Sequence, residues 1–342
     1  MTLRSKPLVS AGCAAALALL AAASAQAALP AGYHLVDLGE GVQPLGGDEA
    51  GDIAGSRTPA GDTRATPVVI SDGRERVLDS GGFGGNAHGV TGDVVVGSVY
   101  TARVGPQSPV LWAADGTRTT LATDASWTST LALARMPDGT VYGTGGTSAL
   151  SHCVRWTGAG PGQPGVVQAF ASGCTVVGAS PSGKLALQTR FGAALWSDGV
   201  TTRAGFLRGG TQSFATGVNA LGHLSAYGDA AQDKVDRPAF FDGQRLLALP
   251  GLGGKRGRAE AINDLDEVAG VADDAEHHSH PFLHTGGQTF AIDGLVDDLG
   301  DFHIQDIVRL GNDGVILADA LIGLRLHGVL LVPTTGAASV SR

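Results

Sequence analysis

A unit of about 44 residues repeats along the chain, and this repetition limits the possible folds more than any other feature. Each copy has two landmarks, a tight turn of the Asn-Asp-x-Gly type and, further on, a short strand that often begins with proline. The strand landmarks are 40 to 47 residues apart and begin at Pro67, Pro109, Cys153, Ala193, Pro238, Pro281 and Gly328. A fixed period in this range is typical of radial arrays of small sheets.

The sixth unit shows what one copy contains. Residues 258–263, 267–271, 279–284 and 288–292 read as four short strands separated by turn residues, which predicts an antiparallel meander. The glycine of the turn stands where the backbone needs a positive φ, and aspartate tolerates that conformation, so Asp266 can replace it. No useful stretch of helical periodicity follows residue 27.

Seven such units fill residues 28–333, so we expect an all-β, seven-bladed β-propeller with four-stranded antiparallel blades. The last unit lacks a fourth strand, and residues 33–38 resemble the fourth strands of other units. The N-terminal strand is therefore predicted to complete the last blade and close the ring. Six blades is the alternative, because the third and fourth units match the pattern least well.

The two ends of the chain are predicted to lie outside the propeller. Residues 1–27 read as a secretory signal peptide, with Arg4 and Lys6 before an apolar run and Ala25-Gln26-Ala27 as the cleavage site. A membrane anchor is disfavoured because the run is too short, and lipidation at Cys13 because the apolar run follows the cysteine. Residues 334–342 are expected to form a short flexible C-terminal tail rich in glycine, alanine and serine. The expected location is secreted or periplasmic.

Charge and cysteine content agree with an exported protein. After residue 27 the chain carries 21 basic and 32 acidic residues, a poor match for nucleic acid, and no later stretch is apolar enough for membrane insertion. Cys153 and Cys174 are the two cysteines that remain. In an oxidising compartment they are expected to form a structural disulfide, with a free catalytic thiol as the alternative.

At this point the repeats resemble a known family. The Asn-Asp turn, the Ala-Gly strand, the His-x-Phe strand and the Leu-Gly-Gly connectors are similar to the HAF-repeat family of bacterial exported proteins. The best copies are residues 261–283 and 216–241. His152, His280 and His327 keep the histidine position, and other copies replace it. The resemblance implies an extracytoplasmic repeat domain and no defined activity.

Few residues stand out from the repeat as candidates for chemistry. Glu276, His277 and His278 lie in a polar loop specific to the sixth unit and are predicted to contact a ligand. The alternatives for this loop are a metal site and a solvated loop without a ligand. The solvated loop is favoured over the metal site, because adjacent residues of an extended chain point to opposite faces and could not both bind one ion. Trp127 lies in a connector and is the second predicted contact. Trp112, Trp156 and Trp196 hold equivalent positions, which favours packing between blades.

The predicted function is that of a non-catalytic propeller that acts as a binding or scaffold protein for a protein or glycan partner, as a monomer and without a cofactor, a metal or catalytic residues. The alternative is a polysaccharide lyase or glycoside hydrolase. The candidate catalytic residues of such an enzyme are Glu260, Asp264, Arg309 and the histidines of residues 277–284. A structural role in the cell envelope is a third hypothesis.

Overall fold

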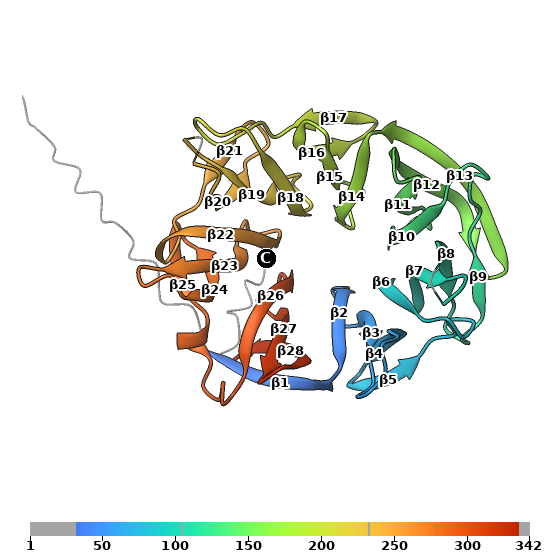
Figure 1. The fold of residues 1–342 in the computed structure, drawn as a ribbon, viewed down its shortest axis with the longest axis horizontal. Helices are drawn as coiled ribbons and strands as arrows, with labels where there is room; N and C mark the ends of the chain where they lie inside the picture. Colours follow the sequence, from blue (N-terminus) through green and yellow to red (C-terminus); the bar gives the residue numbers. More distant parts are fainter. Residues whose placement is uncertain (1–31, 104, 232, 335–342) are drawn as a thin grey trace, which may run out of the picture.

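The computed structural model describes residues 32–103, 105–231 and 233–334, so the predicted signal peptide and almost all of the predicted tail lie outside it. The chain forms seven four-stranded antiparallel sheets arranged in a ring around a central channel (Figure 1). The prediction of a seven-bladed all-β propeller is confirmed, and the six-bladed alternative is wrong. No helix in the described ranges is long and apolar enough to cross a membrane.

Each blade is a meander whose first strand lines the channel. Blades one to four comprise β2 (Val42–Gly47), β3 (Ile53–Arg57), β4 (Thr66–Ser71), β5 (Arg74–Val77); β6 (Gly85–Thr91), β7 (Val94–Tyr100), β8 (Gln107–Trp112), β9 (Arg118–Thr120); β10 (Ser129–Arg135), β11 (Val141–Gly146), β12 (Ser151–Gly160), β13 (Gln163–Ser172); and β14 (Cys174–Ala179), β15 (Leu185–Thr189), β16 (Gly192–Ser197), β17 (Val200–Arg203). Blades five to seven comprise β18 (Ser213–Val218), β19 (Leu224–Asp229), β20 (Asp236–Phe241), β21 (Leu246–Ala248); β22 (Gly253–Ile262), β23 (Val268–Asp274), β24 (Ser279–Thr285), β25 (Gln288–Ala291); and β26 (His303–Leu310), β27 (Ile316–Ile322), β28 (Arg325–Pro333), β1 (Tyr33–Glu40).

The N-terminal strand closes the ring as predicted. β1 is the outer strand of blade seven and pairs antiparallel with β28, from Tyr33 opposite Pro333 to Glu40 opposite His327. The two ends of the propeller therefore meet in one sheet (Figure 1). A short 3-10 helix, η1 (Asp293–Leu295), lies in the connector before β26.

The hydrophobic core is divided among the seam regions between neighbouring blades. Seven clusters of buried side chains are present, one for each seam. Trp112 and Trp156 are fully buried in two of them, and their indole N–H groups donate to the carbonyl oxygens of Asp79 and Ala122 in the preceding blades, at 2.8 and 2.6 Å. The prediction that the equivalent tryptophans pack between blades is confirmed, because Trp196 is buried in the next seam.

The predicted disulfide also crosses a seam. Cys153 on β12 of blade three and Cys174 on β14 of blade four are bonded, with an S–S distance of 2.11 Å, and both are buried. The bond joins the third strand of one blade to the channel-lining strand of the next. It is confirmed as a structural cross-link, and the free catalytic thiol is wrong.

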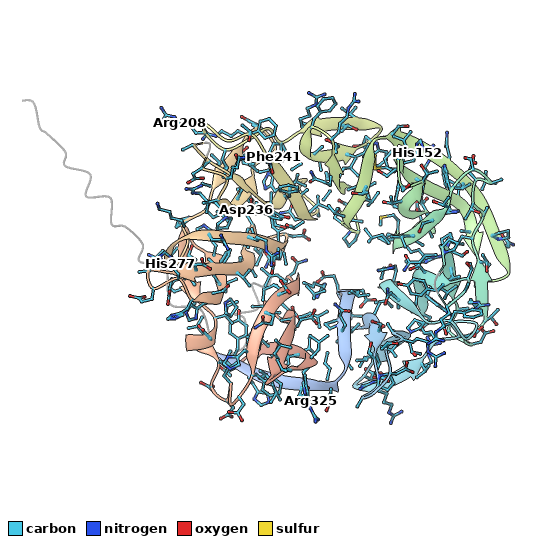
Figure 2. All side chains as sticks on the ribbon, viewed as in Figure 1. His152, Arg208, Asp236, Phe241, His277 and Arg325 are labelled. Carbon is cyan, nitrogen blue, oxygen red and sulfur yellow. A yellow bond between two sulfur atoms is a disulfide. The ribbon has the colours of Figure 1, made fainter. Side chains whose placement is uncertain are left out.

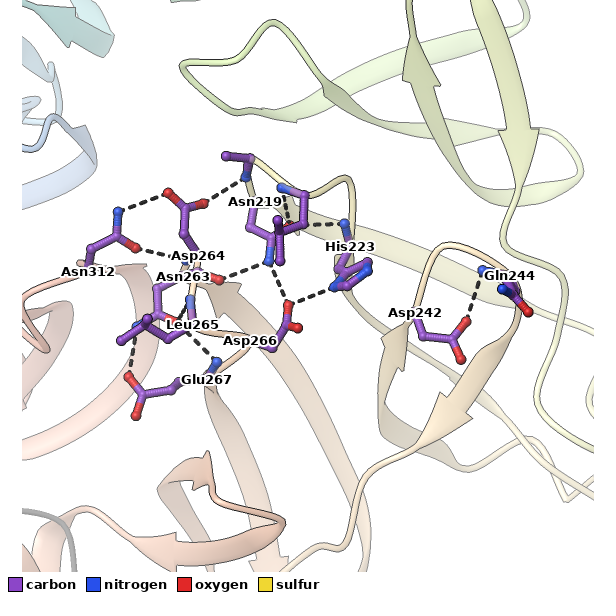
Figure 3. Close-up of polar contacts among 12 residues, drawn as sticks. Asn219, His223, Asp242, Gln244, Asn263, Asp264, Leu265, Asp266, Glu267 and Asn312 are labelled. Atoms are coloured by element: carbon purple, nitrogen blue, oxygen red, sulfur yellow. Dashed lines mark hydrogen bonds and ion pairs between the residues drawn. The ribbon is translucent and has the colours of Figure 1, made fainter. Parts of the chain in front are cut away.

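The Asn-Asp turns link blades to one another in addition to closing a hairpin. Asn219 Nδ2 donates to the carbonyl oxygen of Asn263 at 3.0 Å (Figure 3). Asn263 Nδ2 donates to the carbonyl oxygen of Gly311 at 3.2 Å. Asp264 accepts from the backbone N–H of Ala220 at 2.7 Å. The repeat signature therefore stabilises three consecutive blades. Asp266 has a φ of 60°, which confirms that it replaces the turn glycine.

Candidate functional site

The turns between the first and second strands of all seven blades gather at one end of the channel, and we call this end the mouth. A cavity of about 460 Å³ opens there and is lined by all seven channel strands, β2, β6, β10, β14, β18, β22 and β26. Because each blade is a meander, the loops between second and third strands lie at the opposite end, which we call the far end.

A ring of seven β-bulge residues lines this cavity. In every channel strand the pairing with the second strand shifts register at one equivalent position, three residues before the turn residue, and the extra residue faces the cavity. The ring consists of Leu45, His88, Leu133, Val177, Thr216, Glu260 and Val308. The repeated fold thus presents one variable side chain from each blade at the same depth of the channel.

The residue after each bulge packs against the next channel strand. A Cβ built on Gly46 would lie 2.3 Å from the carbonyl oxygen of His88, and one on Gly89 would lie 2.6 Å from that of Leu133. These contacts explain why the residue at this position is glycine or alanine in six of the seven blades, with Arg309 as the exception. The bulge ring is consequently held at a fixed radius by backbone contacts.

Glu260 is the only acidic member of the ring. Its Oε2 accepts a hydrogen bond from the backbone N–H of Ile307 in blade seven at 2.8 Å, and its Oε1 lies 3.2 Å from an Arg258 guanidinium nitrogen. The same nitrogen contacts Asp306 Oδ1 at 2.9 Å. Burial raises the pKa of Glu260 to about 7, although the hydrogen bond from Ile307 lowers it, and the charge of Asp306 raises it further. A carboxyl group that titrates near neutral pH therefore faces the channel.

The other polar members of the ring are neutral. Burial lowers the pKa of His88 to about 4, and its Nε2 lies 3.1 Å from the hydroxyl of Ser98. Thr216 donates to the carbonyl oxygen of Ala259 at 2.8 Å. With four aliphatic residues, the ring is an apolar collar that carries a single titratable carboxyl group.

The rim around the mouth is acidic. The seven turns carry one lysine, Lys184, and nine acidic residues: Asp48, Glu49, Asp52, Asp93, Asp138, Asp264, Asp266, Glu267 and Asp313. Of the two arginines that line the cavity, Arg309 forms an ion pair with Glu49 across the seam between blades seven and one. The mouth therefore attracts cationic groups more than anionic ones.

Asp319 on β27 is a second carboxylate with an unusual environment. It is buried beside blade one, and its Oδ1 has no hydrogen-bond partner among the described residues. Burial and the charge of Asp306, which pairs with it across the sheet, raise the pKa of Asp319 to about 7. Asp319 does not line the cavity, so it bears on stability more directly than on ligand binding.

Asp319→Asn is expected to raise the free energy of unfolding by about 2 kcal/mol above pH 7, since the buried charge has no full set of partners. The raised pKa fixes the sign. Below the pKa of 3.8 in the unfolded chain, Asp319 is protonated in the folded and the unfolded state and does not destabilise the fold. Between pH 3.8 and about pH 7 the loss of folding free energy caused by this residue grows as the pH rises. Denaturant unfolding of both proteins at pH 4 and pH 8 tests this. The exposed control Asp198→Asn should change stability by less than about 0.5 kcal/mol, and equal stabilisation by Asp319→Asn at both pH values would contradict the account.

The four predicted ligand contacts do not form one site. Glu276, His277 and His278 are exposed in the loop between β23 and β24, at the far end of blade six. His277 lies at the outer edge of the ring (Figure 2). Trp127 precedes β10 in blade three, is half-buried, and stacks on His152 with a centroid distance of 5.7 Å. None of them lines the channel cavity, and their role as ligand contacts stays a prediction.

The histidine loop is organised by Asp274, which sequence reasoning did not single out. Its carboxylate accepts from the backbone N–H of His278 at 2.8 Å and lies 3.1 Å from His280 Nε2. His280 Nδ1 contacts Asp293 at 2.6 Å, so the repeat histidine has structural partners on both sides. No three His, Cys, Asp or Glu side chains come together as metal ligands within the described ranges.

Comparisons with known proteins identify the fold and no closer relationship. No family model matches the sequence, and no curated protein matches it significantly. The β-propeller domain of the Trilobed protease from Pyrococcus furiosus, which has an open velcro topology, aligns with 91% of this chain and 96% of its own at 10% identity and a TM-score of 0.56.

Two further solved structures have similar scores. Virginiamycin B lyase from Staphylococcus aureus, as an inactive variant with quinupristin, aligns with 88% of this chain and 100% of its own at 11% identity and a TM-score of 0.53. YCF48 bound to D1 peptide aligns with 92% and 100% at 14% identity and a TM-score of 0.53. At these identities the likeness shows the propeller fold alone.

Proposed function

We propose that this protein is an exported, non-catalytic binding propeller that takes a cationic side chain of a protein partner into the channel mouth. The bulge ring carries this proposal. It places one carboxyl group, Glu260, in an otherwise uncharged collar at the bottom of an acidic rim. A lysine or arginine side chain has the aliphatic stem that fits such a collar and the charge that pairs with Glu260.

Binding is favoured over catalysis because the candidate catalytic groups are scattered. Asp264 is engaged by Ala220 and Asn312 in the turns, and Arg309 is paired with Glu49. The histidine loop of residues 277–284 lies in blade six, outside the residues that line the cavity. Of these groups, Glu260 alone faces the cavity without being held in a turn, as Asp264 is, or in the ion pair with Glu49, as Arg309 is.

A protein partner is favoured over a glycan by the composition of the cavity. Among the described residues that line it there is no tryptophan, tyrosine or phenylalanine, so these residues offer no such aromatic face on which a sugar ring could stack. An apolar collar with one carboxyl group, Glu260, beneath an acidic rim suits the side chain of a protein loop better. YCF48 with its D1 peptide is an example of a propeller that holds a peptide.

Peptide display tests this proposal. A library with lysine or arginine at a fixed central position should yield binders whose affinity falls at least about tenfold in Glu260→Gln, the loss expected for a half-buried charge pair. Affinity should rise from pH 6 to pH 8, because Glu260 becomes charged near pH 7. The ring variant Val177→Thr is the matched control and should bind normally. Binders that tolerate Glu260→Gln would contradict the proposal.

A second candidate function rests on the same carboxyl group. A pKa near 7, beside the carboxylate of Asp306, is what a general acid of a polysaccharide lyase or glycoside hydrolase requires. Product formation that disappears in Glu260→Gln would identify that activity.

We also propose that the protein is exported and belongs with the HAF-repeat proteins. The disulfide supports an oxidising compartment, and the predicted signal peptide supports export. The resemblance is supported by the roles of its signature residues, since Asn219 and Asn263 link blades and His280 holds two carboxylates. Mass analysis of the protein from the culture fluid and periplasm would test export, with a mature N-terminus at Ala28 as the expected result.

A further inference from the structure

The charges of the chain are segregated along its sequence. Residues 139–228, which span most of blades three to five, contain a single acidic residue, Asp198, and five basic ones: Arg155, Lys184, Arg190, Arg203 and Arg208. The rest of the chain has 18 basic and 31 acidic residues. One sector of the ring is therefore basic in a protein that is otherwise strongly acidic.

Two of these arginines surround an exposed phenylalanine at the far end of blade four. The guanidinium carbons of Arg190 and Arg203 lie 4.5 and 4.1 Å from the ring centroid of Phe191. Neither forms an ion pair with a carboxylate in the part of the chain that the structure describes. The stacked guanidinium groups keep their hydrogen-bond donors available for an anionic ligand.

A groove adjoins this cluster. It measures about 630 Å³ and lies between blades three and four, with Leu150 on one wall, Ser172 and Cys174 at the blade connector, and Arg190 on the other wall. Leu150 and Arg190 belong to far-end loops, and Ser172 and Cys174 are the strand ends on either side of the connector at Gly173. The groove is thus at the opposite end of the molecule from the acidic mouth.

Apolar side chains flank the arginines. Leu150, Phe191 and Phe206 are 48%, 45% and 46% exposed, so three large hydrophobic side chains are exposed on the same surface as the arginines. Phe206 lies against Gly192, next to Phe191, since a Cβ at Gly192 would be 3.2 Å from its ring. Aromatic residues and arginines together are the composition of protein–protein binding hot spots.

We propose that this far-end surface, defined by Leu150, Arg190, Phe191, Arg203 and Phe206, docks an acidic peptide segment of a protein partner. Carboxylates of the segment pair with the two guanidinium groups, and its apolar side chains pack against Leu150 and Phe206. The charge of this sector selects an anionic partner, because most of the remaining surface repels one.

A peptide fits this surface better than a sugar. The ring of Phe191 is covered by guanidinium groups, and the nearby ring of Trp127 is stacked on His152 and packed against Gly145. These two rings offer no free face to a pyranose ring, which leaves Phe206 as the exposed aromatic side chain of the surface. The site is independent of the channel ligand proposed above, because it uses neither the bulge ring nor the acidic rim.

Fluorescence anisotropy tests the proposal with a labelled eight-residue peptide that alternates Asp or Glu with Phe or Leu. We expect micromolar binding that weakens with salt, and at least a tenfold loss of affinity in the double variant Arg190→Glu/Arg203→Glu. Arg245→Glu/Arg325→Glu changes the net charge equally at other exposed arginines and should alter affinity less than twofold. Leu150→Ser/Phe206→Ser should weaken binding while the charges remain.

Three results would overturn the inference. They are the absence of binding by the acidic peptide, an equal loss in the Arg245→Glu/Arg325→Glu control, and equally tight binding of an oligouronate or a single-stranded oligonucleotide with the same dependence on Arg190 and Arg203. Unfolding midpoints of each variant, measured in parallel, show whether a loss reflects the surface or the fold. Glu260→Gln should bind this peptide normally, which separates the test from that of the channel mouth.

Discussion

Deletion of residues 33–40 is expected to destroy the cooperative folded state, because β1 is the outer strand of the blade that closes the ring. The deletion removes a complete antiparallel pairing with β28 and the buried side chain of Tyr33 from the seam between blades six and seven. It also removes the contacts of Asp37 with His327 and of Glu40 with Arg325. We expect a loss of about 5 kcal/mol or more, a large part of the stability of an ordinary domain.

Thermal unfolding followed by circular dichroism measures this effect. Val36→Ser, at an exposed position of the same strand, is the control and should keep a sharp transition. A synthetic peptide of residues 33–40 added to the truncated protein should restore part of the transition. If the deletion left the midpoint within a few degrees, β1 would not be the closing strand.

Replacing both cysteines, as Cys153→Ala/Cys174→Ala, is expected to lower the free energy of unfolding by about 3 kcal/mol, the typical value for a bond that closes a loop of about 20 residues. The bond ties β12 to β14 across the seam between blades three and four. In the reduced chain that seam depends on side-chain packing and on hydrogen bonds such as that from Val176 N–H to Thr144 Oγ1, and the unfolded state gains conformational freedom.

Denaturant unfolding with and without reductant provides the measurement. Reductant should destabilise the natural protein to the level of the double variant and leave the variant unchanged. Alkylation of both thiols in the folded protein without reductant would show that the bond is absent.

Most of the fold could be predicted from the sequence because its signal is periodic. The turn landmarks and the strands that begin at Pro238 and Pro281 recur at a regular spacing, and an Asp at the glycine slot, Asp266, has the expected positive φ. Closure by the N-terminal strand followed from a missing fourth strand in the last unit. The strand boundaries differ by a few residues, most clearly in β22, which begins at Gly253, five residues before the predicted start.

The candidate site was harder to predict because its signal lies in the differences between repeats. The position three residues before each turn residue varies freely, as in Thr216 and Glu260, and nothing local marks it as the bulge that faces the channel. Comparing that one column across the seven units could have found the ring. Asp319 had a clearer signal, because it is a lone carboxylate within the apolar residues 316–321 of β27.

Glu276, His277 and His278 were predicted as ligand contacts because the composition of their loop differs from that of the other repeats. Their distance from the channel could not be inferred without knowing which loops share an end of the propeller. The inter-blade role of Asn219 and Asn263 was also hidden, since the same residues are sufficient to explain a hairpin turn.

Incubation of the purified protein with a panel of polysaccharides and peptides, followed by mass spectrometry, tests the central claim that it binds without catalysis. The account predicts that retained ligands are recovered chemically unchanged, and that Glu260→Gln alters retention at the channel mouth. Accumulation of cleaved product by the natural protein and its loss in Glu260→Gln would contradict the account and identify an enzyme.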